Sequence, residues 1–450
     1  MTDIIGELSW RGLIALSTDR DELRKALDAG LVTVYVGFDP TAPGLHIGNL
    51  VQLLTLRRLQ LAGHRPIALV GGATGLIGDP SGKSAERVFN PREVVAQWVE
   101  RIRGEVSRFL DFSPAPNGAL VVSNLDWTEP LSALEFLRDI GKHFPVSQML
   151  SRESVRARLE AGGISYTEFS YQILQANDFL ELYRREGTTL QLGGSDQWGN
   201  LVSGVDLIRR VEGAAAHALA TPLITKPDGT KYGKTEGGAV WISPDLMSPY
   251  AFYQFWLNRA DEEVPGLLRV FSFRSRAEIE ALEQQSRDKP AARAGQRALA
   301  GEMTDLVHGG DETAKAIAAS RALFGQGDVA ELDEKTLAAA LAEVPSATVH
   351  VGPNPLIPVR SPASSQPDQP AFAADSVADL PPVADLMAAV GLEPSKSAAR
   401  RTIAGGGAYL NNRKVTEPDA RPAPSDLLHG RFLVVRRGKR AVGGVTVERS

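Results

Sequence analysis

The stretch Val32-Thr-Val-Tyr-Val-Gly-Phe38 is followed by a polar loop, Asp39-Pro-Thr-Ala-Pro-Gly-Leu-His-Ile-Gly-Asn49, and then by an apolar run from Leu50 to Leu61. The first part is rich in β-branched residues and predicts a buried strand, and the last part predicts a helix. A histidine and small or amide residues stand where this helix begins, beside its unpaired N–H groups and the positive end of its dipole. This arrangement predicts a phosphate site, although a glycine-rich turn with an incidental histidine has the same pattern.

The same alternation of strand and helix continues along the first half of the chain. Further strand patterns occupy residues 66–70, 120–122 and 189–192, each between amphipathic stretches. This order predicts an α/β fold, with a Rossmann-like parallel sheet and helices on both faces, over a catalytic domain at 1–240. Beyond Trp241 only helical patterns appear, at 249–257, 276–285, 291–307 and 314–324. We therefore expect an all-helical domain at 241–344.

Nine of the 28 prolines lie between Pro345 and Pro382, mixed with Ser, Gln and Ala. Such a density of proline predicts an extended linker at 345–382 without helix or strand. Because a linker of this kind makes few packed contacts, removal of the chain beyond it is expected to leave the helical domain folded. The remaining residues, 383–450, are expected to form a small α+β domain.

The net charge of −5 conceals a strong asymmetry. Residues 396–440 contain eleven Lys or Arg and three acidic residues, an excess of +8, so the rest of the chain carries −13. An acidic body with a basic tail suggests a polyanionic partner such as a nucleic acid. A solvated charged face is the alternative interpretation.

Composition excludes several classes of protein. The 450-residue chain has no cysteine, which excludes disulfides, thiolate zinc sites and cysteine nucleophiles. Its seven histidines are scattered, so no protein-held metal is expected. The first residues are acidic rather than basic, and no apolar run approaches the length of a membrane span. These features predict a cytoplasmic protein with no membrane partner.

Two glycine-rich loops carry basic residues. The segment from Gly71 to Ser84 is not a P-loop, because Ile77 stands where that motif requires glycine, and it leads to Lys83 and Arg87. The loop at 225–235 holds Lys231 and Lys234, whose ammonium groups could move onto a triphosphate, although ordinary surface turns look similar.

Two other segments favour a polar pocket. Tyr171, Gln175 and Asp178 are spaced to share one face of a helix, which is either solvated or the wall of a pocket. The loop Gly193-Gly-Ser-Asp-Gln-Trp-Gly-Asn200 follows a predicted strand, at the edge of the sheet where open α/β folds bind ligands.

Four motifs in order, supported by the tail, resemble bacterial tyrosyl-tRNA synthetases of class I. They are Tyr35-Val-Gly-Phe-Asp-Pro-Thr41, His46-Ile-Gly-Asn49 in place of HIGH, Gly193-Gly-Ser-Asp-Gln-Trp198, and Lys231-Tyr-Gly-Lys-Thr235 in place of KMSKS. The tail from Val383 is similar to an S4-type RNA-binding module. The resemblance implies that tyrosine is activated with ATP, accompanied by Mg²⁺, to tyrosyl-adenylate and pyrophosphate, and is then transferred to the 3′ end of tRNA(Tyr). It also implies a homodimer.

The resemblance carries site residues over by position. Those implied in catalysis are His46, Asn49, Thr41, Lys83, Arg87, Lys231, Lys234 and Thr235. Those implied in tyrosine binding are Tyr35, Asp79, Tyr171, Gln175, Asp178 and Gln197. Those implied in ATP binding are Gly37, Asp39, His46, Gly48, Asn49, Gly194, Asp196 and Lys234, and those implied in RNA binding are Lys396, Arg400 and Arg401. Asn49 replaces the second histidine of HIGH and keeps a hydrogen-bond donor, but it cannot carry charge.

Two alternatives belong to different classes. One is a tryptophanyl-tRNA synthetase or another HIGH-type nucleotidyl transferase, which Tyr35, Asp178 and the S4-like tail disfavour. The other is a non-catalytic RNA-binding protein on an inert α/β body, which the presence of His46, Lys231 and Lys234 disfavours.

Overall fold

The computed structural model describes residues 3–79, 90–160, 162–225, 239–351 and 380–449. Contacts divide the chain into two compact units. The N-terminal unit contains residues 1–247 and 259–299, and the C-terminal unit contains residues 248–258 and 300–450. This division differs from the expected one, because it splits the predicted helical domain at 241–344 between the two units.

The N-terminal unit is built on a six-stranded sheet in the order β1-β6-β5-β2-β3-β4. Its strands are β1 (Leu16–Ser17), β2 (Thr33–Phe38), β3 (Arg65–Val70), β4 (Leu120–Ser123), β5 (Thr188–Gly194) and β6 (His217–Thr221). All neighbours are parallel except β1, which runs antiparallel to β6. The predicted α/β class and its four predicted strands are confirmed. The strand order reverses between β2 and β5, and ligands bind at such a point in open α/β sheets.

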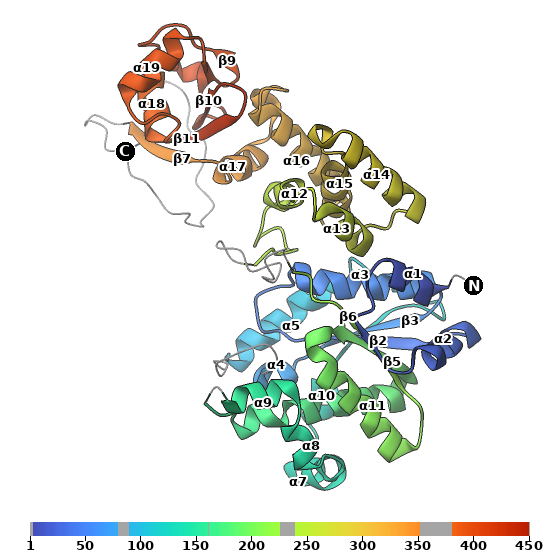
Figure 1. The fold of residues 1–450 in the computed structure, drawn as a ribbon. Coiled ribbons are helices and arrows are strands. Elements are labelled where there is room, and N and C mark those ends of the chain that lie inside the picture. The colour runs from blue at the N-terminus through green and yellow to red at the C-terminus, as the bar shows by residue number, and fades with distance from the viewer. Residues whose placement is uncertain (1–2, 80–89, 161, 226–238, 352–379, 450) are drawn as a thin grey trace. The chain divides into compact units, whose positions relative to one another are not determined.

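Helices cover both faces of this sheet (Figure 1). α3 and α5 pack on one face, whereas α10 and α11 pack on the other, where Tyr35 and Leu69 of the sheet meet Phe179 and Leu207. The helices are α1 (Ile4–Trp10), α2 (Arg20–Ala29), α3 (Ile47–Leu61), α4 (Thr74–Ile77), α5 (Arg92–Val106), α6 (Leu125–Thr128), α7 (Ala133–Glu135), η1 (Phe136–Ile140), η2 (Gly141–His143), α8 (Val146–Leu150), α9 (Glu153–Glu160), α10 (Tyr166–Glu186), η3 (Ser195–Gln197), α11 (Trp198–Glu212), α13 (Val264–Phe271), α14 (Arg276–Asp288) and η4 (Pro290–Ala292). α15 (Ala294–His308) contains residues of both units.

Arg11 explains why residues 259–299 belong to the N-terminal unit. Its buried guanidinium donates to the carbonyl oxygens of Arg269, Ser272 and Arg274 at 2.9, 2.7 and 2.8 Å. Arg58 of α3 donates to the same Ser272 oxygen at 2.8 Å. These charge-assisted bonds satisfy carbonyls at and beyond the end of α13, which have no partner within the helix. They therefore fasten α13 to α1 and α3.

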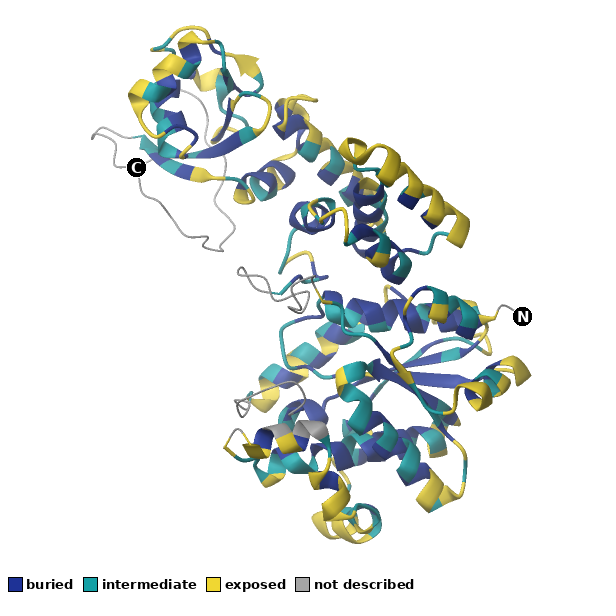
Figure 2. Ribbon diagram, in the orientation of Figure 1, coloured by how far each residue is buried: buried dark blue, intermediate teal, exposed yellow. Residues whose placement is uncertain are grey.

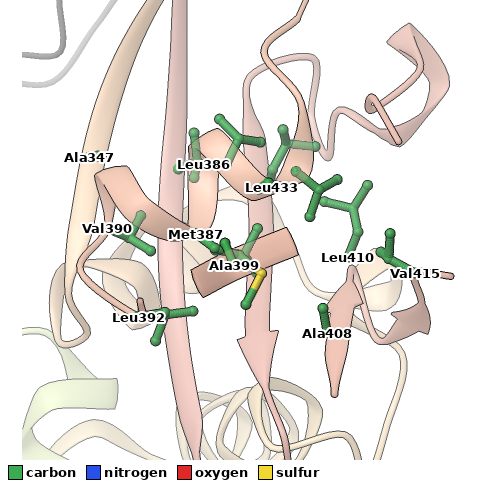
Figure 3. Packing of buried hydrophobic residues seen from close by; sticks show 14 of the residues in the cluster. Ala347, Leu386, Met387, Val390, Leu392, Ala399, Ala408, Leu410, Val415 and Leu433 are labelled. Carbon is green, nitrogen blue, oxygen red and sulfur yellow. The ribbon is translucent and has the colours of Figure 1, made fainter. Parts of the chain in front are cut away.

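The C-terminal unit combines helices with a five-stranded sheet in the order β7-β11-β10-β8-β9. Its helices are α12 (Pro249–Leu257), α16 (Gly310–Leu323), η5 (Val329–Glu331), α17 (Glu334–Ala342), α18 (Val383–Ala389), α19 (Lys396–Ala404) and η6 (Pro424–Asp426). Its strands are β7 (Ser346–Val351), β8 (Ala408–Leu410), β9 (Arg413–Lys414), β10 (Phe432–Arg437) and β11 (Ala441–Arg449). Figure 3 shows the core of this sheet, in which Met387 and Ala399 from the helices meet Leu410 and Leu433 from the strands.

β7 corrects the expected linker at 345–382. It pairs in parallel with β11 from Ser346 opposite Gly444 to Val351 opposite Arg449. Ala347 and Val349 are buried in the core of the C-terminal sheet. The expectation of no strand here was wrong because the prolines flank Ser346–Val351 and do not interrupt it. Residues 352–379 lie outside the described part of the chain.

Polar contacts join the C-terminal sheet to the helices that precede it. Asn412 Nδ2 donates to the carbonyl oxygens of Ala322 and Gly327 at 2.6 and 3.0 Å. Arg431 forms an ion pair with Glu334 at 2.7 Å. The C-terminal domain therefore shares its unit with α16 and α17. Across the described residues of both units, no helix is long and apolar enough to cross a membrane.

Candidate active site

A cavity of about 500 Å³ opens at the carboxyl ends of β2 and β5, where the strand order reverses. Fourteen of the residues expected to bind tyrosine or ATP or to act in catalysis line it, and these are Tyr35, Gly37, Asp39, Thr41, His46, Gly48, Asn49, Asp79, Tyr171, Gln175, Asp178, Gly194, Asp196 and Gln197. Segments up to 162 positions apart in the sequence thus meet in one place. The other predicted members, Lys83, Arg87, Lys231, Lys234 and Thr235, lie outside the described residues.

Tyr35 of β2 and Asp178 of α10 form a buried polar part of the cavity wall. The Tyr35 side chain is 1 % exposed, and its Oη has no hydrogen-bond partner among the described residues. Burial, with the nearby charge of Asp178, raises the pKa of Tyr35 well above its usual value, so the hydroxyl stays neutral. A buried hydroxyl without a partner costs free energy until a ligand supplies one.

Asp178 is held by two donors from another segment. Asn124 Nδ2 donates to Oδ2 at 3.0 Å, and Trp127 Nε1 donates to Oδ1 at 2.8 Å. Burial raises the pKa of Asp178 to about 7, against the two hydrogen bonds, which lower it. Each carboxylate oxygen retains a second acceptor position. Asp178 can therefore accept a further hydrogen bond from a ligand.

Asp39 links β2 to the polar face of α10. Tyr171 Oη donates to Asp39 Oδ2 at 2.6 Å, and Thr74 Oγ1 donates to Oδ1 at 2.6 Å. Burial and the charge of Asp39 raise the pKa of Tyr171 well above its usual value, so Tyr171 remains a donor. The expected polar stripe of α10 therefore faces the cavity rather than solvent.

A chain of side-chain amides crosses the other side of the cavity. Gln197 Nε2 donates to Asp79 Oδ2 at 2.6 Å, and Asn200 Nδ2 donates to the Oε1 atoms of Gln197 and Gln175 at 3.1 and 3.0 Å. These bonds join η3 and the first turn of α11 to α10 and to the segment after α4. The bonds hold a buried carboxylate, Asp79, and the two amides of Gln175 and Gln197 on the wall of the cavity.

His46 and Asn49 form the N-terminal cap of α3. Gly48 N donates to His46 Nδ1 at 3.0 Å, and His46 N donates to Asn49 Oδ1 at 3.1 Å. The pair is a reciprocal capping box, which satisfies N–H groups that a helix start leaves unpaired. With Nδ1 as acceptor, the proton of the neutral ring resides on Nε2. Asn49 thus has a structural role that the sequence did not predict, in addition to its position on the cavity.

Comparisons with known proteins agree with this geometry. Residues 28–325 match the family model described as class I tRNA synthetases (W and Y), and residues 368–442 match the model of a tyrosine--tRNA ligase C-terminal domain. The chain is 61 % identical to a tyrosine--tRNA ligase of Streptomyces coelicolor and 58 % identical to one of Thermobifida fusca, over 99 % of each chain. The chain belongs to the class I tyrosyl-tRNA synthetases.

A solved structure extends this comparison to three dimensions. The C-terminally truncated mitochondrial tyrosyl-tRNA synthetase of Aspergillus nidulans superposes with a TM-score of 0.66 at 28 % identity, over 71 % of this synthetase and 94 % of that chain. The Rossmann-like fold predicted from the sequence is therefore that of the family.

Several polar residues of this synthetase's cavity were not predicted. Gln191 of β5 and Gln52 of α3 line it, and Asn124 and Trp127 support Asp178 from behind. Gln191 is 2 % exposed, and its Oε1 has no hydrogen-bond partner in the described part of the chain. A glutamine in the middle of a buried strand is an unusual polar residue, and this signal could have identified Gln191.

The described residues contain no group of three His, Asp or Glu side chains suited to hold a metal ion.

The cations expected to contact RNA lie on α19. Ser395 caps this helix by accepting from Ala398 N. Lys396 pairs with Asp385 at 2.7 Å, and Arg400 pairs with Asp419 at 2.9 Å. Arg401 is exposed. The expected face of three cations is thus partly neutralised by acidic neighbours.

Proposed function

We propose that the cavity between β2 and β5 holds tyrosine and ATP together, with Tyr35 and Asp178 reading the tyrosine hydroxyl. The synthetase is a tyrosine--tRNA ligase, which activates L-tyrosine with ATP and transfers it to tRNA. The observation that carries the assignment is that Tyr35, whose buried Oη has no hydrogen-bond partner among the described residues, lines the same cavity as the buried carboxylate of Asp178. A phenolic hydroxyl can accept from Tyr35 and donate to Asp178, which would complete both groups.

The amino group of tyrosine is assigned to Tyr171, Gln175, Asp79 and Gln197. Asp79 supplies a buried negative charge, and Tyr171 and the two amides supply oxygen acceptors. These are the groups that a substrate ammonium requires when it leaves water. With both ends of tyrosine held, its carboxylate is directed toward the ATP side of the cavity.

The ATP side is formed by the segments around α3 and the loop after β5. Among the described residues, a Cβ atom added at Gly37 would meet only Leu69 within 4 Å, so a ligand can approach the backbone closely there. His46 and Thr41 would bind the triphosphate near the positive end of α3, and Asp39, Asn49, Gly194 and Asp196 would face the ribose and the substrate. Lys83, Arg87, Lys231, Lys234 and Thr235 are proposed to oppose the charge of the leaving pyrophosphate.

The reaction needs no protein nucleophile. The tyrosine carboxylate attacks the α-phosphorus, the bond to the β-phosphate oxygen breaks, and pyrophosphate leaves with the electron pair. Catalysis then consists of positioning and of stabilising negative charge as it develops. Mg²⁺ is proposed to accompany ATP as the nucleotide complex.

The assignment of the substrate is tested by ATP–pyrophosphate exchange with each amino acid in turn. We expect exchange with tyrosine and little with phenylalanine or tryptophan. Comparable exchange with phenylalanine would contradict the proposed role of Tyr35 and Asp178. No exchange with any amino acid would favour the non-catalytic RNA-binding alternative.

The C-terminal domain is proposed to be an S4-type module that binds tRNA(Tyr) through Lys396, Arg400 and Arg401. Its two helices followed by antiparallel strands, and its excess of basic residues, support this assignment. We further assign the protein to the cytoplasm, in keeping with its cysteine-free composition.

A homodimer is proposed from the surface of the segment 134–166. Six of the eleven strongly exposed large apolar side chains in the described part of the chain lie here, and these are Leu134, Leu137, Val146, Leu150, Leu159 and Tyr166. Figure 2 shows exposed residues along α7 to α9. A concentration of apolar side chains marks an interface with another protein. Light scattering on the wild type and on Leu134→Glu tests this. A dimer that persists in the variant would contradict the assignment of this surface as the dimer interface.

A further inference from the structure

Residues 239–246, here called the strap, run alongside the backbone that leads into α3. Ile47 N donates to Val240 O at 2.9 Å, and Ile242 N donates to Leu45 O at 3.0 Å. His46 and Trp241 form an antiparallel bridge between these bonds. Trp241 lines the cavity, and its ring centroid is 6.4 Å from that of His46. The strap therefore fixes one side of residues 45–47, here called the His46 segment, and one wall of the cavity.

A third element, α5, holds both of these segments through Glu105 and Arg101. Leu45 N donates to Glu105 Oε2 at 2.7 Å, and Arg101 Nε donates to Glu105 Oε1 at 3.2 Å. Arg101 Nη2 then donates to Ser243 Oγ and Asp245 Oδ1 of the strap, at 2.8 and 2.6 Å. One ion pair on a single turn of α5 thus joins the backbone beside His46 to the far end of the strap.

The backbone at Gly44 packs tightly against Glu105 of α5 and Leu246 of the strap. A Cβ atom at Gly44 would lie 2.9 Å from Glu105 Oε1 and 3.0 Å from Leu246 Cδ1. Glycine at position 44 is therefore what allows the Glu105 carboxylate to reach Leu45 N. The carboxylate is buried, with a side-chain exposure of 6 %, whereas the Asp245 side chain at the outer end is 63 % exposed.

Neither Arg101 nor Glu105 is among the residues that line the cavity. Their contacts are with backbone and strap, and hydrogen bonds to charged groups of this kind are stronger than neutral ones. Small displacements of catalytic groups reduce rates steeply, even when the displaced segment is held by residues remote from the chemistry. The strap also begins directly after residues 226–238, which contain Lys231 and Lys234.

We propose that Arg101 and Glu105 are positioning residues for adenylate formation, which hold the His46 segment and the strap in register without touching either substrate. This inference rests on the proposed role of His46 in that step. Because Tyr35, Tyr171 and Asp178 belong to β2 and α10, tyrosine binding does not depend on the Arg101–Glu105 pair. The loss should appear in the rate of adenylate formation rather than in tyrosine affinity.

The test measures single-turnover adenylate formation at saturating substrates, the dissociation constant of tyrosine, and thermal unfolding. We expect Arg101→Ala and Glu105→Gln to slow adenylate formation at least tenfold while the tyrosine dissociation constant changes less than twofold. Arg101→Lys keeps the positive charge and should therefore be faster than Arg101→Ala. It should recover only part of the wild-type rate, because one ammonium cannot satisfy Glu105, Ser243 and Asp245 together. Rates within twofold of the wild type, or a parallel loss of rate and tyrosine affinity, would overturn the proposal.

Two further variants keep the test independent of folding. Ser243→Ala combined with Asp245→Asn acts at the exposed end of the network and is expected to slow adenylate formation several-fold at an unchanged melting temperature. Glu186→Gln breaks the partly buried ion pair between Arg65 and Glu186, 3.2 Å apart, in which Arg65 begins β3 at the opposite edge of the sheet. This matched control should leave the rate unchanged, and an equal loss in it would show a general effect of removing ion pairs.

Combination with His46→Ala separates this inference from the proposed function. If the pair acts through the His46 segment, Glu105→Gln should slow the His46→Ala enzyme much less than it slows the wild type. A wild-type rate for His46→Ala alone would contradict the role of His46 itself. A slow His46→Ala enzyme in which Glu105→Gln has its full effect would contradict positioning through that segment.

Discussion

At the scale of single residues, we expect selectivity for tyrosine to arise from an incomplete hydrogen-bond network. Asp178 has one donor on each oxygen and room for another, and Tyr35 has no partner among the described residues. Phenylalanine would bury these groups without completing them, whereas tyrosine would supply a donor and an acceptor. The penalty for an unpaired buried polar group exceeds the gain from pairing it, so exclusion of phenylalanine follows from the polar atoms of the cavity itself.

Replacement of Tyr35 by phenylalanine should narrow this selectivity. The variant loses one neutral hydrogen bond to the substrate, which corresponds to a fall of about tenfold in kcat/KM for tyrosine. Activation of phenylalanine should not fall, because the variant has no hydroxyl left unpaired. Pyrophosphate exchange with both amino acids measures this, and an unchanged ratio of the two kcat/KM values would refute the contact.

Asp178 should make tyrosine binding depend on pH near neutrality. Its pKa is raised to about 7 in the folded enzyme, and the ionised carboxylate accepts more strongly from the substrate hydroxyl than the protonated acid does. The dissociation constant of tyrosine should therefore rise about tenfold between pH 8 and pH 6, one unit below this pKa. Asp178→Asn should bind weakly with no such dependence, whereas Tyr35→Phe should keep it. Calorimetric titration at several pH values provides the measurement.

The same group affects stability with a definite sign. Between pH 4 and 7 the folded protein holds a proton on Asp178 that the unfolded chain has lost. The free energy of unfolding contributed by this residue consequently falls as the pH rises from about 4 to about 7. Denaturant unfolding of the wild type and of Asp178→Asn should differ in slope over this range. Parallel pH profiles would indicate that Asp178 is ionised throughout.

Tyr35 could be proposed from sequence because it stands in a motif of a known family, and Asp178 because it shares one helix face with Tyr171 and Gln175. Asn124 and Trp127 could not, since their importance comes from contacts with a residue 54 and 51 positions further along the chain. Nothing local distinguishes them from other polar and aromatic residues. The roles of the lysines at 231 and 234 remain predictions.

At the scale of elements, one residue at the start of α3 has two roles, because His46 is both the N-terminal cap of the helix and the proposed catalytic histidine. His46→Ala should slow adenylate formation about 100-fold, the usual cost of losing one transition-state donor, and should also remove a helix cap. His46→Asn keeps a side-chain acceptor for Gly48 N and should regain stability without regaining the rate. Unfolding and single-turnover rates distinguish the two effects, and recovery of the rate in His46→Asn would mean that only the cap matters.

The cations of α19 should not contribute equally to tRNA binding. Lys396 and Arg400 must exchange acidic partners for phosphates, whereas no ion pair is seen for Arg401 among the described residues. Arg401→Ala should weaken tRNA binding and lower the slope of log affinity against log salt by about one. Lys396→Ala should have a smaller effect on both. Equal effects would mean that the surface pairs do not compete with RNA.

An element could be predicted from the sequence where its own residues have a strong preference for that secondary structure. β2, β3 and β5 are largely buried, β4 is partly buried, and all four are rich in branched residues, and they were predicted. β6 reads His217-Ala-Leu-Ala-Thr221 and has little β preference, so its strand form depends on β5 beside it. β7 alternates small or polar residues with valine, but the surrounding prolines dominated the prediction.

At the scale of the whole molecule, the Pro-rich segment does not separate the C-terminal domain from the rest. β7 precedes this segment, yet it pairs with β11, which follows it. Removal of residues 361–450 would therefore uncover Val349 and leave β7 without its partner strand in the described structure. The expectation that such a truncation exposes no core was wrong.

Cleavage of the chain within residues 361–370 and truncation there should consequently have different effects on tRNA charging. A chain cut there by an inserted protease site should stay assembled, because β7–β11 pairing and the contacts of Asn412 and Arg431 remain. The pieces should co-elute and should still charge tRNA. Fragment 1–360 should keep tyrosine-dependent pyrophosphate exchange and lose charging. Separation of the cut pieces at physiological salt would contradict the packing described for this unit.

The position of β11 in its sheet also governs when the domain can form during synthesis. Among the described strands of this sheet, β11 comes last in the sequence, and it lies between β7 and β10. β7 therefore has no partner strand on the nascent chain until nearly a hundred further residues have left the ribosome. The Rossmann-like catalytic domain is already free to fold by then. The C-terminal sheet thus becomes structured only after the catalytic domain has been completed.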